Sequence, residues 1–590
     1  MTLDQTLLFG LLVIVFALLV WGPWRYDLVA FAALLVAVLM GLVPVWGAFS
    51  GFGHPATVII ALVLIVSRGL SNSGAIELIA GLVINQSRKL GAHIAIMSSF
   101  SAVLSALMNN VAALTLIMPV DMQAAAKANR SPALTLMPIS FASILGGMIT
   151  LIGTPPNIVV GEYRNTALGT PFRMFDFAPV GIAVASVGVA YLAFIGWRLL
   201  PAGRKDADSS KELFEVANYI AELEVAEDSP TIGQRVRDLD DDAARVGVDI
   251  VGLVRRGKRM PGLARMVEVR AGDKLVVEAA PEAIDEMLGA MGLVYVGSGR
   301  DALNEESLSL IEVVVPESSS LAGRSSSSMQ LLYRYGVSLV GVSRAGRRFR
   351  ENVRKLIVKP GDVLLLLGTD ERLADVISRI GVLPLKSRGQ RVLQRDKAWL
   401  AVGIFAVAIL MASLGLVYLP IALGVACVLF VLLDIVPIRT VYNSVEWPVI
   451  VLLGSMIPIG GALESTGSTS LIADGIVSLA AGGSPALVLT LLIIVTMTLS
   501  DVMNNTATAV IAAPVAVQIS QLLGTNSDPF LMGVAVAASC AFLTPIGHKN
   551  NTLIMGPGGY RFGDYWRMGL PLEILVIAVS VPMILWVWPF

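Results

Sequence analysis

Cysteine and histidine are scarce in this chain of 590 residues, which has two cysteines and three histidines. Cys427 and Cys540 both lie inside apolar runs, where a cysteine is expected to pack as a small apolar residue. No disulfide framework and no cysteine-based metal centre is therefore predicted. The chain also lacks a G-x-G-x-x-G dinucleotide motif and any His/Cys/Asp group with catalytic spacing. These absences argue against an enzyme.

Charge is sparse and unevenly distributed. Charged residues make up 15% of the chain and the net charge is −1, so no general polyanion-binding surface and no nucleic-acid partner is expected. Residues 201 to 397 hold most of the Lys, Arg, Asp and Glu, between flanks of apolar runs long enough to span a membrane. Met1 to Gln5 lacks the basic segment of a cleaved signal peptide, so Leu7 to Trp21 is expected to be a retained first span.

The apolar runs form two series that match element by element, which predicts a polytopic α-helical membrane protein with two membrane repeats, residues 1–207 and 391–590. The weakly amphipathic segment from Ser71 to Lys89 is expected to lie at the membrane interface. The runs fall near residues 5–22, 27–45, 55–70, 94–126, 133–168 and 177–200, and again near 398–418, 420–437, 447–463, 485–522, 530–560 and 568–589.

One polar phrase occurs once in each series, deep inside apolar sequence. It is Ser105-Ala-Leu-Met-Asn109-Asn110 in the first and Ser500-Asp-Val-Met-Asn504-Asn505 in the second. Each copy is followed, 40 to 45 residues later, by a helix-breaking Thr-Pro: Gly153-Thr154-Pro155-Pro156, then Thr544-Pro545-Ile546-Gly547. Polar groups and freed backbone at hydrocarbon depth are tolerated where they line a cavity. Matching interruptions in two halves point to the substrate site of a secondary transporter.

The interrupted runs 94–126 and 485–522 are long enough to enter and leave a membrane, but awkward as single spans. Each is expected to be a re-entrant hairpin with its Asn-Asn pair at the tip, followed by a broken helix. If the N-terminus lies outside, nearly all Lys and Arg of the membrane halves fall inside, Arg164 and Arg173 excepted. The halves then run in opposite directions as inverted repeats, and residues 201–397 are cytoplasmic.

At such a tip, helix ends leave backbone groups without intrahelical partners. Carbonyls and Asn amide oxygens suit a hard cation such as Na⁺, and N–H groups at the positive end of a helix suit a small anion. A bound cation also compensates an anion held at membrane depth. The alternative is that the Asn pairs are interhelical hydrogen-bond links and the Thr-Pro breaks are kinks. Two copies with matched breaks favour the transport site.

The polar block is itself a repeat, which predicts two small α+β cytosolic domains inserted between the membrane repeats, residues 208–298 and 299–390. Gly247-Val-Asp-Ile-Val-Gly resembles Gly336-Val-Ser-Leu-Val-Gly, and in both copies a Gly-Asp pair follows 25 residues later. Ser318 to Ser328 is expected to be a mobile loop, with a ligand contact as the alternative.

Together these motifs resemble the divalent-anion:sodium symporter family of the ion transporter superfamily. The resemblance implies an elevator-type carrier that moves sulfate, phosphate or carboxylates with Na⁺, usually as a homodimer, in a bacterial-type plasma membrane. The middle block resembles the C-terminal regulatory module of TrkA-type (RCK) proteins, which implies a small regulatory ligand. Carried over by position, the expected Na⁺ ligands are Ser105, Asn109, Asn110, Gly153, Ser500, Asn504, Asn505 and Leu543, and the expected substrate contacts are Asn109, Asn110, Asn504, Asn505, Thr506, Thr544 and Pro545.

The chain departs from the family pattern. Asn109 and Asn504 replace signature serines, Val111 replaces a threonine, and Asp501 places a carboxylate four residues before Asn505. These changes leave H⁺ coupling open. Lys549 is expected to pair with the substrate, to take the place of a coupling cation as a fixed positive charge, or to sit at the cytoplasmic interface.

The sequence thus favours cation-coupled uptake of a small divalent anion, with sulfate as the first candidate. A Na⁺/dicarboxylate symporter is the alternative within transport. A channel gated by the RCK-type domains is the alternative of another class, but no repeated Gly-rich filter is found.

Overall fold

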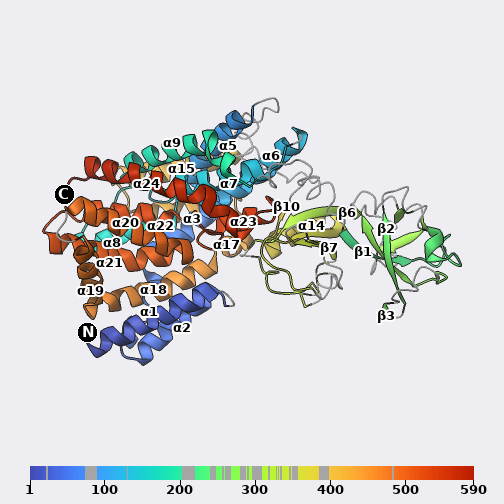
Figure 1. Cartoon of the computed structure of the whole chain (residues 1–590), viewed down its shortest axis with the longest axis horizontal. Coiled ribbons are helices and arrows are strands. Elements are labelled where there is room, and N and C mark those ends of the chain that lie inside the picture. Colours follow the sequence, from blue (N-terminus) through green and yellow to red (C-terminus); the bar gives the residue numbers. More distant parts are fainter. Residues whose placement is uncertain are drawn as a thin grey trace.

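The structure is a computed structural model of the whole chain, and it has a helical part continued by two small β-rich modules (Figure 1). The residues it describes are 1–21, 24–73, 89–128, 130–201, 219–239, 243, 248–255, 258–259, 267–279, 287–288, 291–295, 308–316, 319–326, 328–329, 331, 335, 337–344, 347–348, 356–384, 397–480 and 484–590. Most of the segment predicted to lie at the interface, Ser71 to Lys89, and part of the Ser-rich stretch from Ser318 to Ser328 fall outside the described residues.

The helical part contains two runs of helices that occupy the two predicted membrane halves. The first run is α1 Leu3–Trp21, α2 Tyr26–Leu39, α3 Pro55–Asn72, α5 Leu90–Leu107, α6 Asn110–Lys127, α7 Ala133–Gly147, α8 Pro155–Leu168 and α9 Ala178–Phe194. The second is α15 Ala398–Ser413, α16 Leu419–Leu432, α17 Ile438–Ser444, α18 Trp447–Ser465, α19 Ser468–Leu479, α20 Pro485–Val502, α21 Asn505–Leu523, α22 Asp528–Ser539, α23 Lys549–Met555 and α24 Tyr565–Val587.

Local sequence explains where several of these helices begin and end. Proline stands in the first turn of α3, α8, α18 and α20, where its missing N–H costs no intrahelical bond. Gly169 after α8 and Gly524 after α21 adopt the left-handed conformation, which glycine tolerates and which closes a helix. Both interrupted apolar runs are split as predicted, because α5 ends before Asn109 and α20 ends before Asn504.

In the described part of the chain, six helices are long and apolar enough to cross a membrane, and further apolar helices of 10–17 residues accompany them. The chain is therefore a multi-pass membrane protein.

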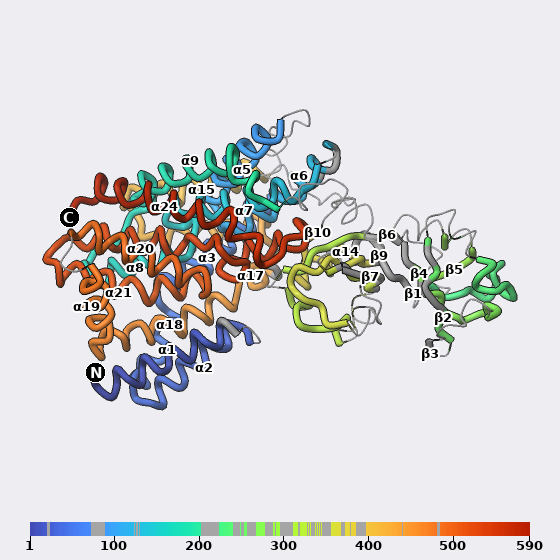
Figure 2. Tube along the Cα trace, in the orientation of Figure 1, coloured from blue at the N-terminus to red at the C-terminus, as the bar shows by residue number. Residues whose placement is uncertain are grey.

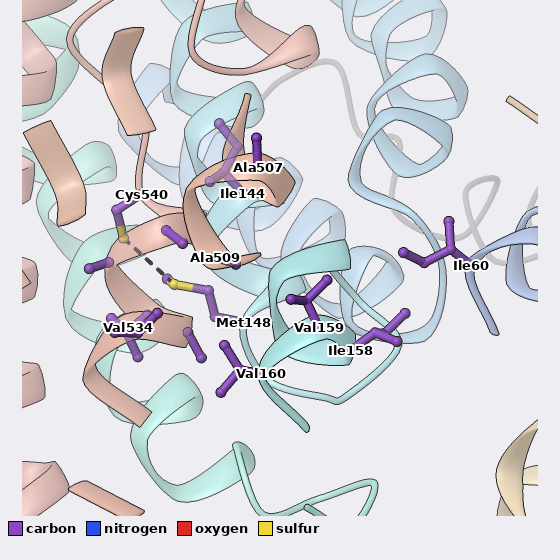
Figure 3. Packing of buried hydrophobic residues seen from close by; sticks show 14 of the residues in the cluster. Ile60, Ile144, Met148, Ile158, Val159, Val160, Ala507, Ala509, Val534 and Cys540 are labelled. Atoms are coloured by element: carbon purple, nitrogen blue, oxygen red, sulfur yellow. Dashed lines mark hydrogen bonds between the residues drawn. The ribbon is translucent and has the colours of Figure 1, made fainter. Parts of the chain in front are cut away.

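The two halves share one apolar core rather than forming separate bundles. Helix α8 of the first half packs against α21 and α22 of the second, and α9 packs against α24. Figure 3 shows the centre of this packing, where the Cys540 thiol lies 3.6 Å from the sulfur of Met148. The rings of Phe141 and Phe542 also meet across the halves, with centroids 5.0 Å apart. Cys427 and Cys540 are both free and buried, as predicted.

Two five-stranded antiparallel sheets lie between the helical halves in sequence. The first has the order β3-β2-β4-β1-β5 and the second β10-β6-β9-β7-β8. Their strands are β1 Tyr219–Val225, β2 Asp249–Arg255, β3 Lys258–Arg259, β4 Lys274–Ala279 and β5 Leu293–Tyr295, then β6 Leu308–Val314, β7 Ser338–Arg344, β8 Arg347–Arg348, β9 Val363–Thr369 and β10 Leu383–Pro384, with helix α14 Asp370–Ile380.

The second sheet repeats the first in detail. A bulge interrupts the pairing between Ile250 and Gly252 in the first sheet and between Leu339 and Gly341 in the second, so equivalent positions are 89 apart. In each module an arginine forms a two-pronged ion pair with the aspartate of the predicted Gly-Asp turn: Arg255 with Asp273, and Arg344 with Asp362. The repeat seen in the polar block is therefore a repeat of structure.

Candidate functional site

The first tip is built by the polar phrase that interrupts the first apolar run. Helix α5 ends at Leu107, the chain is extended at Met108, and α6 begins at Asn110. Ser105 Oγ donates to Asn110 Oδ1 at 2.6 Å, and both side chains are buried. Asn109 Oδ1 accepts from the backbone N–H of Val111 at 2.8 Å, so this side chain caps the start of α6.

The second tip repeats these contacts. Ser500 Oγ donates to Asn505 Oδ1 at 3.1 Å, and Asn504 Oδ1 accepts from the N–H of Thr506 at 3.0 Å. Met503 is extended, like Met108. One serine and two asparagines at the same spacing therefore build the same helix-break-helix unit twice.

Each tip is tied to its downstream break by one threonine. Thr150 Oγ1 donates to the carbonyl of Ala106 at 2.5 Å and accepts from the N–H of Gly153 at 3.2 Å. Thr544 Oγ1 donates to the carbonyl of Asp501 at 2.5 Å and accepts from the N–H of Gly547 at 3.1 Å. The threonine fixes the irregular backbone of the break against the end of the helix that leads to the tip.

These contacts shift the predicted match between the two breaks. The sequence pairs Thr154-Pro155 with Thr544-Pro545, but in the structure Thr544 takes the role of Thr150. Thr154, the residue before α8, then corresponds to His548, the residue before α23. The two Thr-Pro pairs look alike in the sequence but are not equivalent, because the role of each threonine depends on its distance from the next helix.

An asparagine side chain also donates a hydrogen bond to a backbone carbonyl of each break. Asn157 Nδ2 donates to the carbonyl of Thr150 at 2.9 Å, and Asn551 Nδ2 donates to the carbonyl of Thr544 at 3.1 Å. Both side chains are buried. Freed carbonyls at a break need such partners because no water reaches them at this depth.

The second break reaches across to the first tip. His548 Nε2 lies 3.1 Å from Asn110 Nδ2, and Asn550 Nδ2 donates to the carbonyl of Asn110 at 3.3 Å. His548 Nδ1 accepts from the N–H of Asn550 at 3.1 Å. The side-chain amide of Asn110 thus meets Ser105 through its oxygen and His548 through its nitrogen. The two halves therefore form one polar site.

Glycines bring the backbone close to this site. A Cβ at Gly147 would lie 2.1 Å from Asn110 Oδ1, and one at Gly153 would lie 2.4 Å from the carbonyl oxygen of Gly147. Neither position has room for a side chain.

Lys549 points away from the tips. Its ammonium pairs with the carboxylate of Glu446, at the start of α18, and lies 5.8 Å from the ring centroid of Tyr26. Lys549 therefore has a partner within the protein, and its role at the interface or at the substrate stays a prediction.

The predicted site residues lie around the two tips and breaks, at different depths. Ser105, Asn110, Gly153, Ser500, Asn505, Thr506 and Pro545 are buried, while Asn109, Asn504, Leu543 and Thr544 are half-buried. In the described part of the chain no hydrogen bond joins the two Asn-Asn pairs directly; His548 and Asn550 link the halves instead. Five residues that hold the tips and breaks in place were not among the predicted site residues: Thr150, Asn157, His548, Asn550 and Asn551. The sequence signal that could have found them is a polar residue that recurs at the same distance after each break.

The donor set fits a hard cation. Among the described residues, the side-chain oxygens of Asn157, Asn550 and Asp501 include buried atoms that meet no hydrogen-bond donor. Unpartnered buried oxygens are costly unless something positive binds them, and amide and carboxylate oxygens are the ligands that Na⁺-like cations prefer.

Comparisons with known proteins place the chain among anion carriers. Residues 16–481 match the family described as "Citrate transporter", and residues 394–590 match the "Sodium:sulfate symporter transmembrane region". An uncharacterized transporter of Synechocystis is 29% identical over 98% of this chain and 97% of its own length. The uncharacterized transporter YfbS of Escherichia coli is 28% identical over 98% of each chain. Sodium/sulfate cotransporter 1 of Chlamydomonas reinhardtii is 24% identical over 57% of this chain and 40% of its own. The chain thus belongs to the citrate transporter family, within the wider group of divalent-anion transporters that the sequence motifs indicate.

Proposed function

We propose that this protein is a cation-coupled secondary transporter that takes up a small divalent anion, with sulfate as the substrate and Na⁺ as the coupling ion. The observation that carries this proposal is the doubled tip, in which a serine and two asparagines are arranged alike in both halves. The match to the sodium:sulfate symporter region and the similarity to a sodium/sulfate cotransporter support the choice of ions. Family membership favours a carrier over a channel gated by the modules.

Each part of the site has a proposed task. The Na⁺ ions are held near each tip by oxygens of Ser105, Asn110, Gly153, Ser500, Asn505 and Leu543, with Asn109 and Asn504 beside them. The anion lies between the tips, near Thr506, Thr544 and Pro545, and faces the positive ends of α6 and α21. The imidazole of His548 also contributes to this lining. The bound cations compensate the charge of the anion.

The helices divide into two groups in a way that supports an elevator motion. Helices α5 to α9 pack with α20 to α24 around the site, while α2 packs with α18 and α3 with α16; the contacts of α18 with α21 and of α3 with α8 form the boundary between the two groups. We propose that the site group moves against the other group, which anchors a homodimer in a lipid bilayer. The halves are proposed to be inverted repeats in a bacterial inner membrane, with residues 201–397 in the cytoplasm.

Uptake by reconstituted vesicles tests this proposal. Labelled sulfate should accumulate in proteoliposomes when Na⁺ is high outside, and should stay at the level of empty vesicles when K⁺ replaces Na⁺. Sulfate uptake that ignores both Na⁺ and H⁺ gradients would rule out the coupled carrier.

A carboxylate substrate is the second candidate, because the match to the citrate transporter family spans both halves. Competition in the same vesicles separates the candidates. Unlabelled sulfate should reduce uptake of the label more strongly than succinate or citrate at equal concentration. The reverse order would favour the carboxylate carrier.

We also propose that the two modules regulate transport, in response to a small cytoplasmic ligand. The second module lies next to the end of the helical part where α17 is found (Figure 2). The backbones of Gly361 and Gly556 approach so closely that a Cβ on Gly556 would lie 2.1 Å from the oxygen of Gly361. Gly556 directly follows α23, and His548 is the N-cap of that helix. A shift of this module is thereby coupled to the second break.

A further inference from the structure

Two carboxylic acids face each other behind the second tip, in a place that the predicted site does not use. Asp501 lies in the last turn of α20 and Glu573 lies in α24, and their carboxyl groups face each other at consecutive residues of the second break. Only 3% of Asp501 and 6% of Glu573 is exposed.

Backbone amides at the second break orient this acid pair. Asp501 Oδ1 accepts from the N–H of Leu543 at 2.9 Å, and Glu573 Oε1 accepts from the N–H of Phe542 at 3.4 Å. Asp501 Oδ2 is buried and meets no donor group in the described part of the chain. Two acceptor groups thus face each other with no donor supplied between them.

The first half has no such pair. The carbonyl of Ala106 meets Thr150 as the carbonyl of Asp501 meets Thr544, so Ala106 stands at the position of Asp501. Gly181 lies against Met148, and Gly569 lies against Phe542. A Cβ built on either glycine would lie less than 3 Å from the carbonyl oxygen of that residue.

The equivalent contacts of Gly181 and Gly569 also identify the residue of the first half that corresponds to Glu573. Ala185 follows Gly181 by one helical turn, as Glu573 follows Gly569 by one turn. Ala106 and Ala185 are both buried. Two methyl groups in the first half are therefore replaced by two carboxyl groups in the second, within the same backbone frame.

No protein cation compensates this pair within the described residues. Neither carboxyl group forms an ion pair with a Lys, Arg or His there; the other titratable group that faces them is the thiol of Cys540, at the end of α22. A buried charge without a partner is strongly unfavourable at membrane depth. The pair therefore calls for a positive ligand.

We propose that Asp501 and Glu573 form a cation-binding site, present in the second half only, that holds one Na⁺ between the two carboxyl groups. A monovalent ion fits because one oxygen of each acid already accepts a backbone N–H, which leaves too few ligands for the six to eight that Ca²⁺ takes. The described residues also contain no group of three or more acidic, His or Cys side chains.

The proposal rests on the proposed cation coupling and makes it asymmetric. With one Na⁺ bound and one proton shared by the two acids, the pair carries no net charge and the site group can move through the bilayer. Without it, movement would carry a buried uncompensated charge. The site thus makes movement depend on the cation and ties the second tip to the coupling ion.

Thermal unfolding of the purified full-length protein tests the site without requiring transport. NaCl is titrated against choline chloride at constant ionic strength, for wild type, Asp501→Asn and Glu573→Gln, because a bound ion raises the melting temperature. Each isosteric variant should raise the Na⁺ concentration of half-maximal stabilisation by about tenfold or more. The matched control is Glu464→Gln, which changes an exposed acid of α18 that contacts Tyr163. It should behave like wild type.

The outcomes separate this site from the proposed function. If Na⁺ does not stabilise wild type, the proposed Na⁺ coupling fails. If wild type responds and both variants respond with the same midpoint, the acid pair is not a Na⁺ site. If the stabilisation of wild type follows pH and not Na⁺, the pair holds a proton and the proposal is overturned.

A second measurement needs no variant. A hydrophobic carbodiimide attaches to a protonated buried carboxyl group, and mass spectrometry locates the adduct. Na⁺ should protect Asp501 and Glu573 from modification, whereas choline should not. Equal modification in both salts would contradict the proposed site.

Discussion

The two halves of this protein share a backbone frame and differ in the chemistry placed on it. Ser105 with Asn110 and Ser500 with Asn505 make equivalent contacts, and a threonine ties each tip to its break. At the positions of Ala106, Ala185 and Thr154, the second half has Asp501, Glu573 and His548. The shared polar contacts hold irregular backbone in place, so they are needed twice. Of the residues that differ, His548 meets the first tip, whereas Asp501 and Glu573 lie behind the second tip.

The largest effect is expected where the halves meet. Asn110→Ala removes the hydrogen bond from Ser105 and the contact with His548, and leaves buried polar partners unsatisfied, which costs about 1–3 kcal/mol per group. Asn505→Ala removes only the contact within its own half. Both variants should lose transport, but Asn110→Ala should lower the melting temperature more. Equal losses of stability would show that the contact between the halves adds nothing.

Making the second half resemble the first sharpens the comparison. The double variant Asp501→Ala with Glu573→Ala recreates the pair Ala106 and Ala185. Because the double variant removes the cost of burying two carboxyl groups without a cation, its free energy of unfolding in choline should rise above that of wild type. Stabilisation by Na⁺ should weaken at the same time. Chemical denaturation in the two salts measures both changes, and a less stable double variant in choline would contradict the account of an uncompensated pair.

The module contact is expected to have a moderate effect. Gly556→Ala places a methyl group against Gly361, and overpacking of this kind costs about 1–3 kcal/mol. Gly556 has helical dihedral angles, φ −67° and ψ −61°, so the substitution itself adds no backbone strain. Protease accessibility of the second module should increase and transport should change.

Gly461→Ala is the matched control for this contact, since a Cβ there would meet no atom within 4 Å. It should leave both protease accessibility and transport as in wild type. If Gly556→Ala also changes neither, the modules are not coupled to α23.

The smallest effect compares the two modules. Asp273 holds the pKa of Arg255 above its ordinary value, mainly through their hydrogen bonds. Arg255 is partly exposed, so solvent screening reduces what the pair contributes, and Asp273→Asn should destabilise the first module by about 1 kcal/mol or less. Asp362→Asn should destabilise the second module by a similar amount. It should also weaken the contact between the neighbouring Gly361 and Gly556. Limited proteolysis of the two variants compares their effects on the contact between Gly361 and Gly556. If both variants weaken that contact equally, the expected difference between the modules is contradicted.

Much of the frame follows from the sequence. Apolar length predicts the helices, the Asn-Asn phrases predict where α5 and α20 end, and the repeated Gly-Asp turns predict two similar modules. These signals are local, because they depend on hydrophobic length and on helix-capping chemistry.

The contacts between the halves could not be predicted in the same way. Nothing near His548 in the sequence shows that it meets Asn110, and the Thr-Pro similarity suggested the wrong match between the breaks. The pairing of Asp501 with Glu573 depends on how α20 packs against α24, 70 residues away along the chain. Such contacts are set by tertiary packing, which a single sequence does not display.

The central claim is that both halves build one anion site that works only with its cation. Calorimetric titration of sulfate into the purified protein, with Na⁺ and with choline, tests it most directly, because linked ligands raise each other's affinity. Sulfate should bind wild type in Na⁺ and only weakly in choline, and binding should be lost in Asn110→Ala and in Asn505→Ala alike. Sulfate binding that is equal in both salts, or that survives either substitution unchanged, would contradict the account.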